Sequence, residues 1–342
     1  MKKSSLISGI VLLALAAFVV AFAPAAWSST PKADAPRVTI SVAENDTASN
    51  VAMKLRSNGI VVTTIGYNIY SVLDAAARRP KLGDYQLQPG MSYKTIARLL
   101  ATGPAREEIQ LQVIEGWTLR DVATMLSQGG TTSTEPFYRS VGNVSSSTGF
   151  DSEWRTDYPF LASLPTDATL EGYLFPDTYR VWKDQLPESL IKKQLDAFAV
   201  HAPDWQAAAK AQNVPLKDVV TLASIIEKEV QTPEDRRIVA GIFINRLNDD
   251  MALQSDATLN YITNSGRANS TAADLAIDSP YNTYKYRGLP PGPICNPSAD
   301  AIEAALHPTQ TNYRYFLTDK EGKVYYAKTL EEHNQNKVKA GY

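Results

Sequence analysis

Apolar residues recur along this chain mostly at helical spacing, and one short unit appears three times. Segments 47–55, 92–100 and 118–126 all fit the pattern [ST]-x-x-x-[IV]-A-x-x-L, whose apolar positions at +4, +5 and +8 share one helical face. The first residue of each unit is a good helix N-cap. Each unit is followed by a glycine placed to end a helix: Gly59, Gly103 and Gly129. The pattern therefore predicts three short amphipathic helices.

Strand-like segments surround the first two units. Residues 37–42 (RVTISV) and 83–89 (GDYQLQP) are predicted strands, and residues 69–78 form a further predicted helix between the units. This order of elements predicts a small α+β module over residues 37–104. A strand within 107–116 then leads into the third helix and a larger second domain, residues 105–342.

The second domain also mixes helices with strands. Residues 128–150 are rich in Ser, Thr and Gly, so we expect a mobile surface insertion there. Two strands joined by a turn at Asp319–Gly322 close the chain, over 313–319 and 323–328. Together the elements predict an α+β fold. The helices predicted in this domain after the insertion span residues 188–199, 205–212, 216–229, 235–247 and 298–305.

The N-terminus carries a long uncharged run. After Lys2 and Lys3, no residue from Ser4 to Pro31 is charged, and about 20 apolar residues suffice to cross a bilayer. We expect a cytoplasmic tail at 1–4, a transmembrane anchor at 5–27, and a linker at 28–36, with the rest outside the cytoplasm. A cleaved signal peptide is the alternative, because Ala26-Trp27-Ser28 loosely resembles a cleavage site.

Charge and composition exclude several classes of function. There are 34 basic and 36 acidic residues, a net charge of −2, which argues against a nucleic-acid-binding protein because such proteins concentrate basic residues. One cysteine, Cys295, and three widely separated histidines give no metal-ligand spacing. Neither a G-x-S-x-G motif nor a GK[ST] phosphate loop occurs. An enzyme with this sequence is therefore expected to use carboxylates, with no cofactor and no metal.

Two carboxylates end the apolar segment LASIIEKEV, residues 222–230. On a helix over 216–229, Glu227 and Glu229 lie about 80° to either side of the apolar face. Such a boundary carboxyl, partly removed from water, can acquire a raised pKa and act as a general acid. A solvated helix end is the alternative, and periodicity does not choose between the two residues. Because they diverge around the helix, they do not form a two-carboxylate glycosidase pair.

Polar and aromatic residues are concentrated in two later segments. YNTYKYRGLPPGP (281–293) combines tyrosines with an amide and a stiff Pro-Pro turn, a composition suited to binding sugar rings or, alternatively, to a packed structural loop. In LQSDATLNY (253–261), Gln254, Ser255 and Asp256 are placed to line a cleft or to cap the following helix.

Several motifs in a fixed order carry a resemblance to a known family. ASIIEKE, VAGIFINRL, LQSD, YNTY, GLPPGPI and ALHPTQTNYRYF follow one another, with EGYLFPDTY upstream. In this the chain resembles the catalytic domain of the YceG-like family, the MltG-type endolytic murein transglycosylases. LGDY and PGMS resemble the family's LysM-like N-terminal module. The segment 128–150 and Cys295 depart from the family pattern.

The resemblance implies a bacterial inner-membrane protein with a single span and an extracytoplasmic catalytic domain. It implies non-hydrolytic cleavage between N-acetylmuramic acid and N-acetylglucosamine, leaving 1,6-anhydro ends and terminating nascent glycan strands near peptidoglycan synthases. Two alternatives stay open, a hydrolase of the same bond and a non-catalytic glycan-binding protein. By motif, the first Glu of E-K-E is the expected catalytic acid, Glu227. The expected glycan contacts are Gln254, Ser255, Tyr281, Asn282 and Tyr284.

Overall fold

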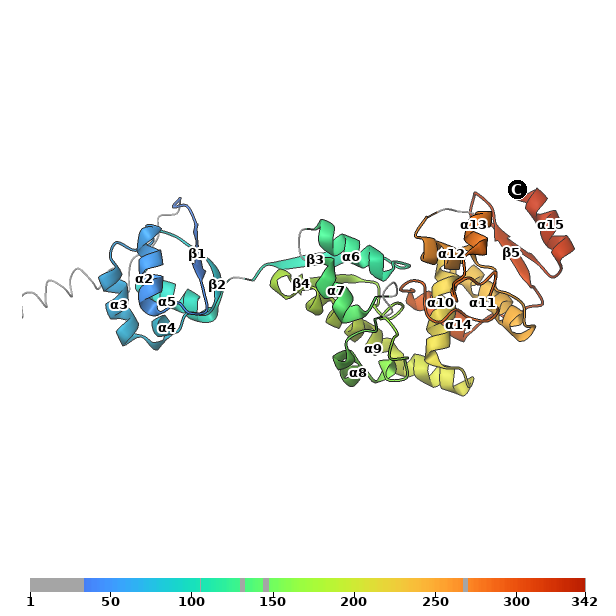
Figure 1. Cartoon of the computed structure of the whole chain (residues 1–342), viewed down its shortest axis with the longest axis horizontal. Coiled ribbons are helices and arrows are strands. Elements are labelled where there is room, and N and C mark those ends of the chain that lie inside the picture. The colour runs from blue at the N-terminus through green and yellow to red at the C-terminus, as the bar shows by residue number, and fades with distance from the viewer. Residues whose placement is uncertain (1–33, 105, 130–132, 144–147, 267–269, 342) are drawn as a thin grey trace, which may run out of the picture. The chain divides into compact units, whose positions relative to one another are not determined.

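The structure is a computed structural model, and it describes residues 34–104, 106–129, 133–143, 148–266 and 270–341. The expected tail (1–4), the anchor (5–27) and most of the linker lie outside these residues. No helix of the described part has both the length and the apolar character needed to cross a bilayer. The chain divides into two compact units, Met1–Arg106 and Glu107–Tyr342 (Figure 1). Each unit combines helices with small antiparallel sheets, so the predicted α+β class is confirmed.

The N-terminal unit packs short helices against a two-stranded sheet. β1 pairs antiparallel with β2, with Val38 opposite Leu87 and Val42 opposite Gly83. Alternate strand residues, among them Ile40 and Tyr85, are buried in the core of this unit. Its elements are β1 (Val38–Val42), α2 (Ala48–Ser57), α3 (Thr64–Leu73), α4 (Ala75–Arg78), β2 (Gly83–Leu87) and α5 (Tyr93–Thr102).

The repeated unit forms helices as predicted. Thr47, Ser92 and Thr118 are the N-caps of α2, α5 and α6 (Leu119–Gln128), and each side chain accepts a backbone N–H. At the other end, Gly59 and Gly103 adopt positive φ angles of 71° and 107°, the conformation for which glycine is favoured. Gly129 differs, because its φ of −69° is right-handed.

The helix predicted over 69–78 is wrong in its bounds. α3 begins earlier, because the Thr63 hydroxyl accepts the Gly66 N–H at 3.2 Å and caps it. It ends at Leu73, since Asp74 adopts an extended conformation and α4 starts after it. The Asp74 carboxylate accepts the hydroxyl of Tyr70 at 2.7 Å.

The C-terminal unit is built around α10 (Leu216–Glu229), at the position predicted for this helix. Residues 219–226 of α10 are all buried, because α9, α11, α12 and α14 pack around it. β3 pairs antiparallel with β4, and β5 with β6. The other elements are β3 (Glu108–Gln112), α6, α7 (Thr134–Val141), α8 (Ser152–Asp157), η3 (Pro159–Leu161), β4 (Thr178–Trp182), η4 (Lys183–Gln185), α9 (Glu188–Ala211), α11 (Pro233–Asn248), α12 (Asp256–Thr263), α13 (Ala272–Ala276), α14 (Ala299–Leu306), β5 (Tyr315–Thr318), β6 (Val324–Ala327) and α15 (Leu330–Lys339).

Two expectations for this unit need correction, and one helix was missed. The described part of 128–150 contains α7, whose Phe137 and Val141 are completely buried, so it contributes to the core and is no surface insertion. The helices expected at 188–199 and 205–212 are one helix, α9, which continues through Pro203. Burial of Phe198 and Trp205 on either side of that proline stabilises the continuous form. Helix α15 was not predicted at all.

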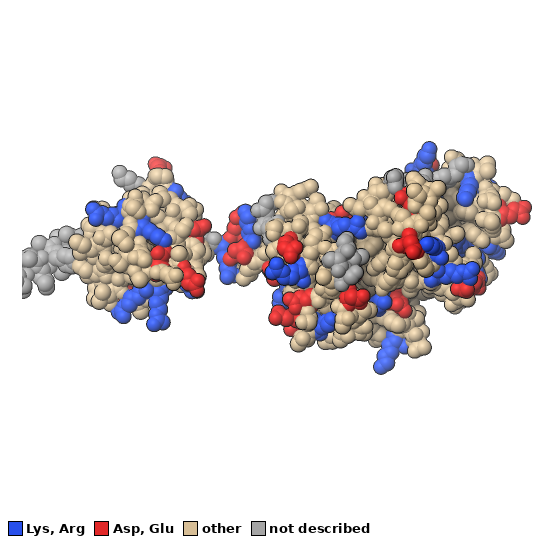
Figure 2. All heavy atoms as spheres, viewed as in Figure 1, with Lys and Arg blue, Asp and Glu red and all other residues tan. Residues whose placement is uncertain are grey.

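Basic and acidic side chains are interspersed over the face of each unit drawn in Figure 2. Helix α9 carries both signs of charge, whereas α2 and α5 carry only basic residues. This mixed distribution agrees with the near-neutral net charge and provides no extended basic surface on the face drawn.

Candidate active site

The last turn of α10 emerges from the core, and it carries both candidate carboxylates. Because residues 219–226 are buried on every side, the helix has no solvent-facing stripe along most of its length. Glu227 and Glu229 are each partly buried. Their surroundings come from different segments of the chain, and these surroundings distinguish them.

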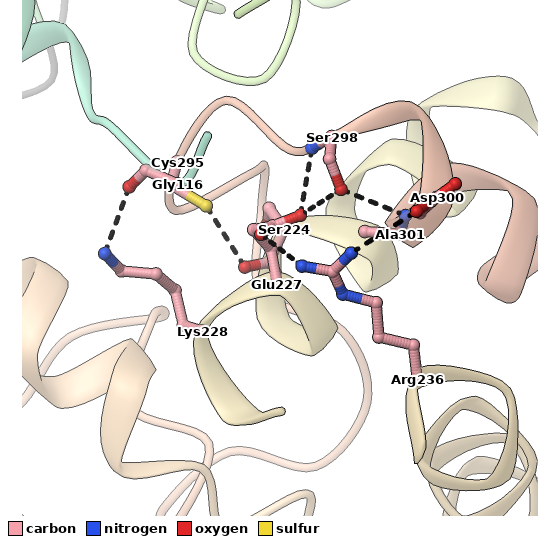
Figure 3. Close-up of polar contacts among 9 residues, drawn as sticks. All are labelled: Gly116, Ser224, Glu227, Lys228, Arg236, Cys295, Ser298, Asp300 and Ala301. Atoms are coloured by element: carbon pink, nitrogen blue, oxygen red, sulfur yellow. Dashed lines mark hydrogen bonds and ion pairs between the residues drawn. The ribbon is translucent and has the colours of Figure 1, made fainter. Parts of the chain in front are cut away.

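Glu227 is held in a network of polar contacts (Figure 3). Its Oε1 accepts from Arg236 Nη2 at 2.7 Å, and the two side chains are only 7% and 12% exposed. Its Oε2 accepts the backbone N–H of Ser298 at 2.9 Å and the Ser298 hydroxyl at 2.5 Å. Ser298 is the N-cap of α14. Glu227 therefore ties the end of α10 to α11 and α14, and it is not among the residues that line the cavity described next.

A large cavity opens on the other side of the α10 terminus. Its volume is about 1070 Å³, at the upper end of the roughly 300–1,000 Å³ typical of small-molecule sites. It therefore has room for more than one sugar ring. Its polar and aromatic lining residues include Arg120, Asp121, Lys228, Glu229, Arg246, Gln254, Ser255, Asp256, Asn260, Tyr261, Tyr284, Tyr315, His333 and Lys337.

Glu229 lines this cavity and has the chemistry of an acid near neutral pH. Burial raises the pKa of its carboxyl to about 7, and the charge of Asp256 acts in the same direction. A hydrogen bond from the Ser255 hydroxyl to Glu229 Oε1, at 2.5 Å, and the positive charge of Arg246 oppose this shift. A carboxyl with such a pKa holds a proton in a substantial fraction of molecules at neutral pH and can donate it.

The loop that delivers Ser255 is strained and lacks its usual cap. Ser255 is the N-cap residue of α12, but its side chain makes no capping bond and donates to Glu229 instead. A missing cap costs about 0.5–2 kcal/mol. The preceding residue, Gln254, has a φ of 51°, a left-handed conformation that costs a non-glycine residue about 1–3 kcal/mol. Such costs are typical of functional loops.

The other predicted contacts divide into two groups. Gln254, Ser255 and Tyr284 line the cavity, and the Tyr284 hydroxyl donates to Asp256 Oδ1 at 3.0 Å. Tyr281 does not line it but packs against the ring of Tyr261, with 5.2 Å between centroids.

Asn282 is a structural residue of its loop. Its side chain is completely buried. The amide nitrogen donates to the carbonyl oxygens of Leu275 and Ile277, and the amide oxygen accepts the N–H groups of Tyr284 and Lys285. Its hydrogen-bonding groups are thus engaged within the loop. Asn282 does not line the cavity.

Two basic residues of the cavity were not anticipated from the sequence. Arg246 is 6% exposed and donates to the carbonyl oxygens of Arg314 and Leu253 at 2.6 and 2.7 Å. Arg120 lies over the ring of Tyr261 and donates to the carbonyl oxygen of that residue. The sequence did offer a signal for Arg246. It lies in FINRL among the apolar residues Phe243 and Leu247, where a charged side chain is unusual.

A second buried carboxyl, that of Glu171, contacts the cavity residue Tyr261. Glu171 accepts the backbone N–H of Leu119, at the start of α6, and the Tyr261 hydroxyl at 3.2 Å. Burial raises the pKa of Glu171 to about 8. Glu171 does not line the cavity. Its hydrogen bonds hold Tyr261 and the start of α6 in place. Within the described residues, no cluster of three or more His, Cys, Asp or Glu side chains could hold a metal ion.

Comparison with known proteins identifies the family. The YceG-like family matches residues 40–339. The endolytic murein transglycosylase of Streptococcus pneumoniae is 35% identical over 321 residues, 87% of this chain, which spans only 57% of that relative's length. The Bacillus subtilis protein of the same name is 32% identical over 310 residues, covering 88% of this chain and 84% of its own.

A solved structure agrees with these matches. The crystal structure of a yceG-like protein from Listeria monocytogenes superposes with a TM-score of 0.58 at 30% identity, covering 89% of this chain and 100% of that one. The family match extends over both compact units, and the relatives align along most of the chain. The chain belongs to the YceG-like family.

Proposed function

We propose that this protein is an endolytic lytic transglycosylase, which cleaves the bond between N-acetylmuramic acid and N-acetylglucosamine in peptidoglycan strands. Relatives at 32–35% identity carry the name endolytic murein transglycosylase. The cavity supports a glycan substrate because tyrosine rings, amides and carboxylates line it together. Tyr261, Tyr284 and Tyr315 offer aromatic surface against which the C–H faces of sugars pack.

The general acid in this proposal is Glu229, in place of Glu227. The observation that carries it is a carboxyl in the cavity wall whose pKa is raised to about 7 and whose Oε1 accepts a hydrogen bond from Ser255. Glu227, by contrast, is occupied by Arg236 and Ser298 outside the cavity. The family resemblance implied the first Glu of the E-K-E motif, Glu227, whereas these contacts support the second, Glu229.

The reaction needs only one protein carboxyl. Glu229 donates its proton to the glycosidic oxygen as the bond from that oxygen to C1 of muramic acid breaks. The 6-hydroxyl of the same sugar attacks C1, and its proton passes to the Glu229 carboxylate. No water is consumed, the product ends in 1,6-anhydro-muramic acid, and Glu229 is protonated again for the next cycle.

A hydrolase of the same bond is the second candidate, because Asp256 lines the cavity and its charge acts on Glu229. A second carboxylate in the cavity could activate water, as in inverting glycosidases. Mass spectrometry separates the two reactions. Products with 1,6-anhydro ends, each one water lighter than the hydrolytic product, support the transglycosylase. Products with reducing ends support the hydrolase, and uncleaved strands support a glycan-binding protein.

Paired substitutions test the acid. Glu229→Gln keeps shape but cannot donate a proton, so cleavage should fall by about 100- to 10,000-fold, the usual contribution of a general acid. Glu227→Gln should retain most of the kcat of the folded enzyme. Circular dichroism and thermal unfolding of both variants check that each is folded. Full activity of Glu229→Gln, or a larger loss of kcat in folded Glu227→Gln, would contradict the assignment.

We also infer that residues 5–27 anchor the protein in the bacterial inner membrane, with the two units outside the cytoplasm and access to strands emerging from the synthases there. The uncharged run from Ser4 to Pro31 supports this inference. The full-length protein should sediment with membranes. A mature N-terminus near Ser29 would show cleavage of a signal peptide instead.

A further inference from the structure

One wall of the cavity has no part in the proposed chemistry, and it is formed by β5 and α15. Leu330, His333 and Lys337 of α15 all line the cavity, and their spacing of three and four residues places them on one helical face. Facing residues come from β5, with Tyr315, Leu317 and Thr318 in the lining. We call these six residues the α15 wall.

His333 contributes unused hydrogen-bonding capacity to the α15 wall. Its ring stacks on Tyr315, with 5.4 Å between centroids, so its orientation is restrained. Its Nδ1 is buried and has no hydrogen-bond partner among the described residues. A buried polar atom left without a partner costs about 1–3 kcal/mol. In a residue that lines the cavity such an atom needs an explanation, and a bound ligand that rearranges the side chain and pairs with it provides one.

The same wall carries a positive charge, that of Lys337, which no carboxylate of the described residues neutralises. Within the described part of the chain, Lys337 has no ion pair or hydrogen bond. Burial, together with the charges of Lys337 and Arg246, lowers the pKa of His333, so its imidazole is neutral at neutral pH with one donor and one acceptor. The acidic residue of α15 nearest in sequence to His333, Glu332, turns to the Lys328 N–H at 2.7 Å.

A cation, a neutral imidazole and apolar Leu317 and Leu330 match a short acidic peptide with alkyl side chains. In peptidoglycan, the sugars bear no net charge in their ring hydroxyls, and the carboxylates belong to the peptide attached to muramic acid. We propose that the α15 wall is a subsite for this stem peptide, with Lys337 binding a peptide carboxylate and His333 hydrogen-bonding a peptide amide. This proposal rests on the proposed function, since it places the peptide beside the sugar whose bond Glu229 protonates.

The proposal predicts a preference that depends on the peptide. Strands with intact stem peptides are compared with the same strands stripped of peptide by an amidase. Lys337→Gln should raise KM about tenfold on peptide-bearing strands, as expected for the loss of a charge-assisted contact, and leave KM on stripped strands within about twofold. His333→Phe keeps the ring stack on Tyr315 but removes both nitrogens, and it should act in the same direction. The matched control is Lys339→Gln, on the same helix but outside the cavity.

A direct binding measurement separates failure of this proposal from failure of the proposed function. Calorimetry with a free stem peptide and the Glu229→Gln protein requires no cleavage. The subsite is supported, whatever reaction the enzyme performs, if Lys337→Gln weakens peptide binding about tenfold and Lys339→Gln leaves it unchanged. Equal KM changes on peptide-bearing and stripped strands, or peptide binding unaffected by Lys337→Gln, would overturn it.

Discussion

Glu227 and Glu229 are two residues apart and lie about 80° to either side of the apolar face on a helical wheel. Their chemistry differs because of residues far away in the chain. Arg236 and Ser298 surround one carboxylate, and Ser255 and the cavity surround the other. Local spacing contains no information about these partners. A helical wheel can therefore name the pair of candidates, and only the tertiary contacts separate them.

The pH dependence of cleavage follows from the pKa of Glu229. The protonated carboxyl is the active form, so kcat/KM should fall as pH rises through about 7. Ser255 donates to this carboxyl and thereby lowers its pKa. Ser255→Ala should remove that stabilisation of the carboxylate and move the alkaline limb of the kcat/KM profile to higher pH, by about 0.5–1 unit.

A matched serine provides the control for this shift. Ser298 donates to Glu227 at the same distance of 2.5 Å, so Ser298→Ala should leave the alkaline limb unchanged. A shift of the limb in Ser298→Ala, with none in Ser255→Ala, would return the acid to Glu227.

Sequence reasoning named three residues that line the candidate cavity. Gln254, Ser255 and Tyr284 were recognised because polar residues beside a helix start, or in an aromatic loop, suit a cleft. The same reasoning included Asn282, whose side-chain amide hydrogen-bonds to backbone groups of its own loop. An amide that binds a ligand and an amide that holds a loop have identical sequence signals, so only the hydrogen-bond partners distinguish them.

At the scale of elements, Glu227 joins three helices. Its carboxylate links the end of α10 to Arg236 of α11 and to the N-cap of α14 (Figure 3). Glu227 and Arg236 are both largely buried. Removing either side chain therefore leaves an uncompensated charge in a poorly hydrated place. The network thereby joins the last turn of α10 to α11 and α14.

This network predicts a measurable loss of stability. Arg236→Gln should lower the free energy of unfolding by about 3 kcal/mol, the lower end for breaking a buried ion pair, as measured by urea unfolding. Arg139→Gln breaks the exposed pair with Glu135, whose side chains are 76% and 77% exposed, and should change it by less than about 1 kcal/mol. Similar losses in both variants would mean that the Glu227 pair has no special structural role.

The elements themselves were predictable where local signals agree with burial. α10 matches its predicted range because apolar periodicity and packing coincide there. α9 was divided in two because Pro203 signals a break, whereas burial of the helix on both sides of the proline keeps it continuous. α15 was missed although Thr329 and Glu332 have the spacing of a capping box, since a polar helix with little apolar periodicity gives no hydrophobic signal.

At the scale of the whole molecule, each unit has a hydrophobic core of its own. The two clusters of buried residues share no member, one lying within 40–100 and the other within 113–306. The cavity and both candidate carboxylates belong entirely to the C-terminal unit. Folding and catalysis by this unit should therefore be independent of the N-terminal unit.

Deleting residues 1–106 tests this independence. It also tests whether the N-terminal unit, whose LGDY and PGMS motifs resemble a LysM-like module, binds glycan strands. The fragment 107–342 should unfold cooperatively and retain kcat on saturating strands within about twofold, while its KM for long strands rises. Thermal unfolding and steady-state kinetics measure these quantities. An unchanged KM would mean that the N-terminal unit has another role, and a fragment that fails to fold would contradict the division of the core.

The position of Glu229 as the final residue of α10 has a consequence for folding. Unpaired carbonyl groups give a helix C-terminus a partial negative charge of about −0.5, which disfavours an anionic side chain there by about 0.3–1 kcal/mol. Lys228, the basic residue of the same turn, donates to the Gly116 carbonyl oxygen at 3.0 Å. The helix dipole thus opposes ionisation of Glu229 and favours its acidic form. Because burial raises the pKa of Glu229 from 4.5 to about 7 in the folded protein, the fold loses stability progressively as pH rises from about 4.5 to about 7. A base at this position would complement the helix dipole, so under the proposed mechanism the acid at the end of α10 lowers stability in exchange for reactivity.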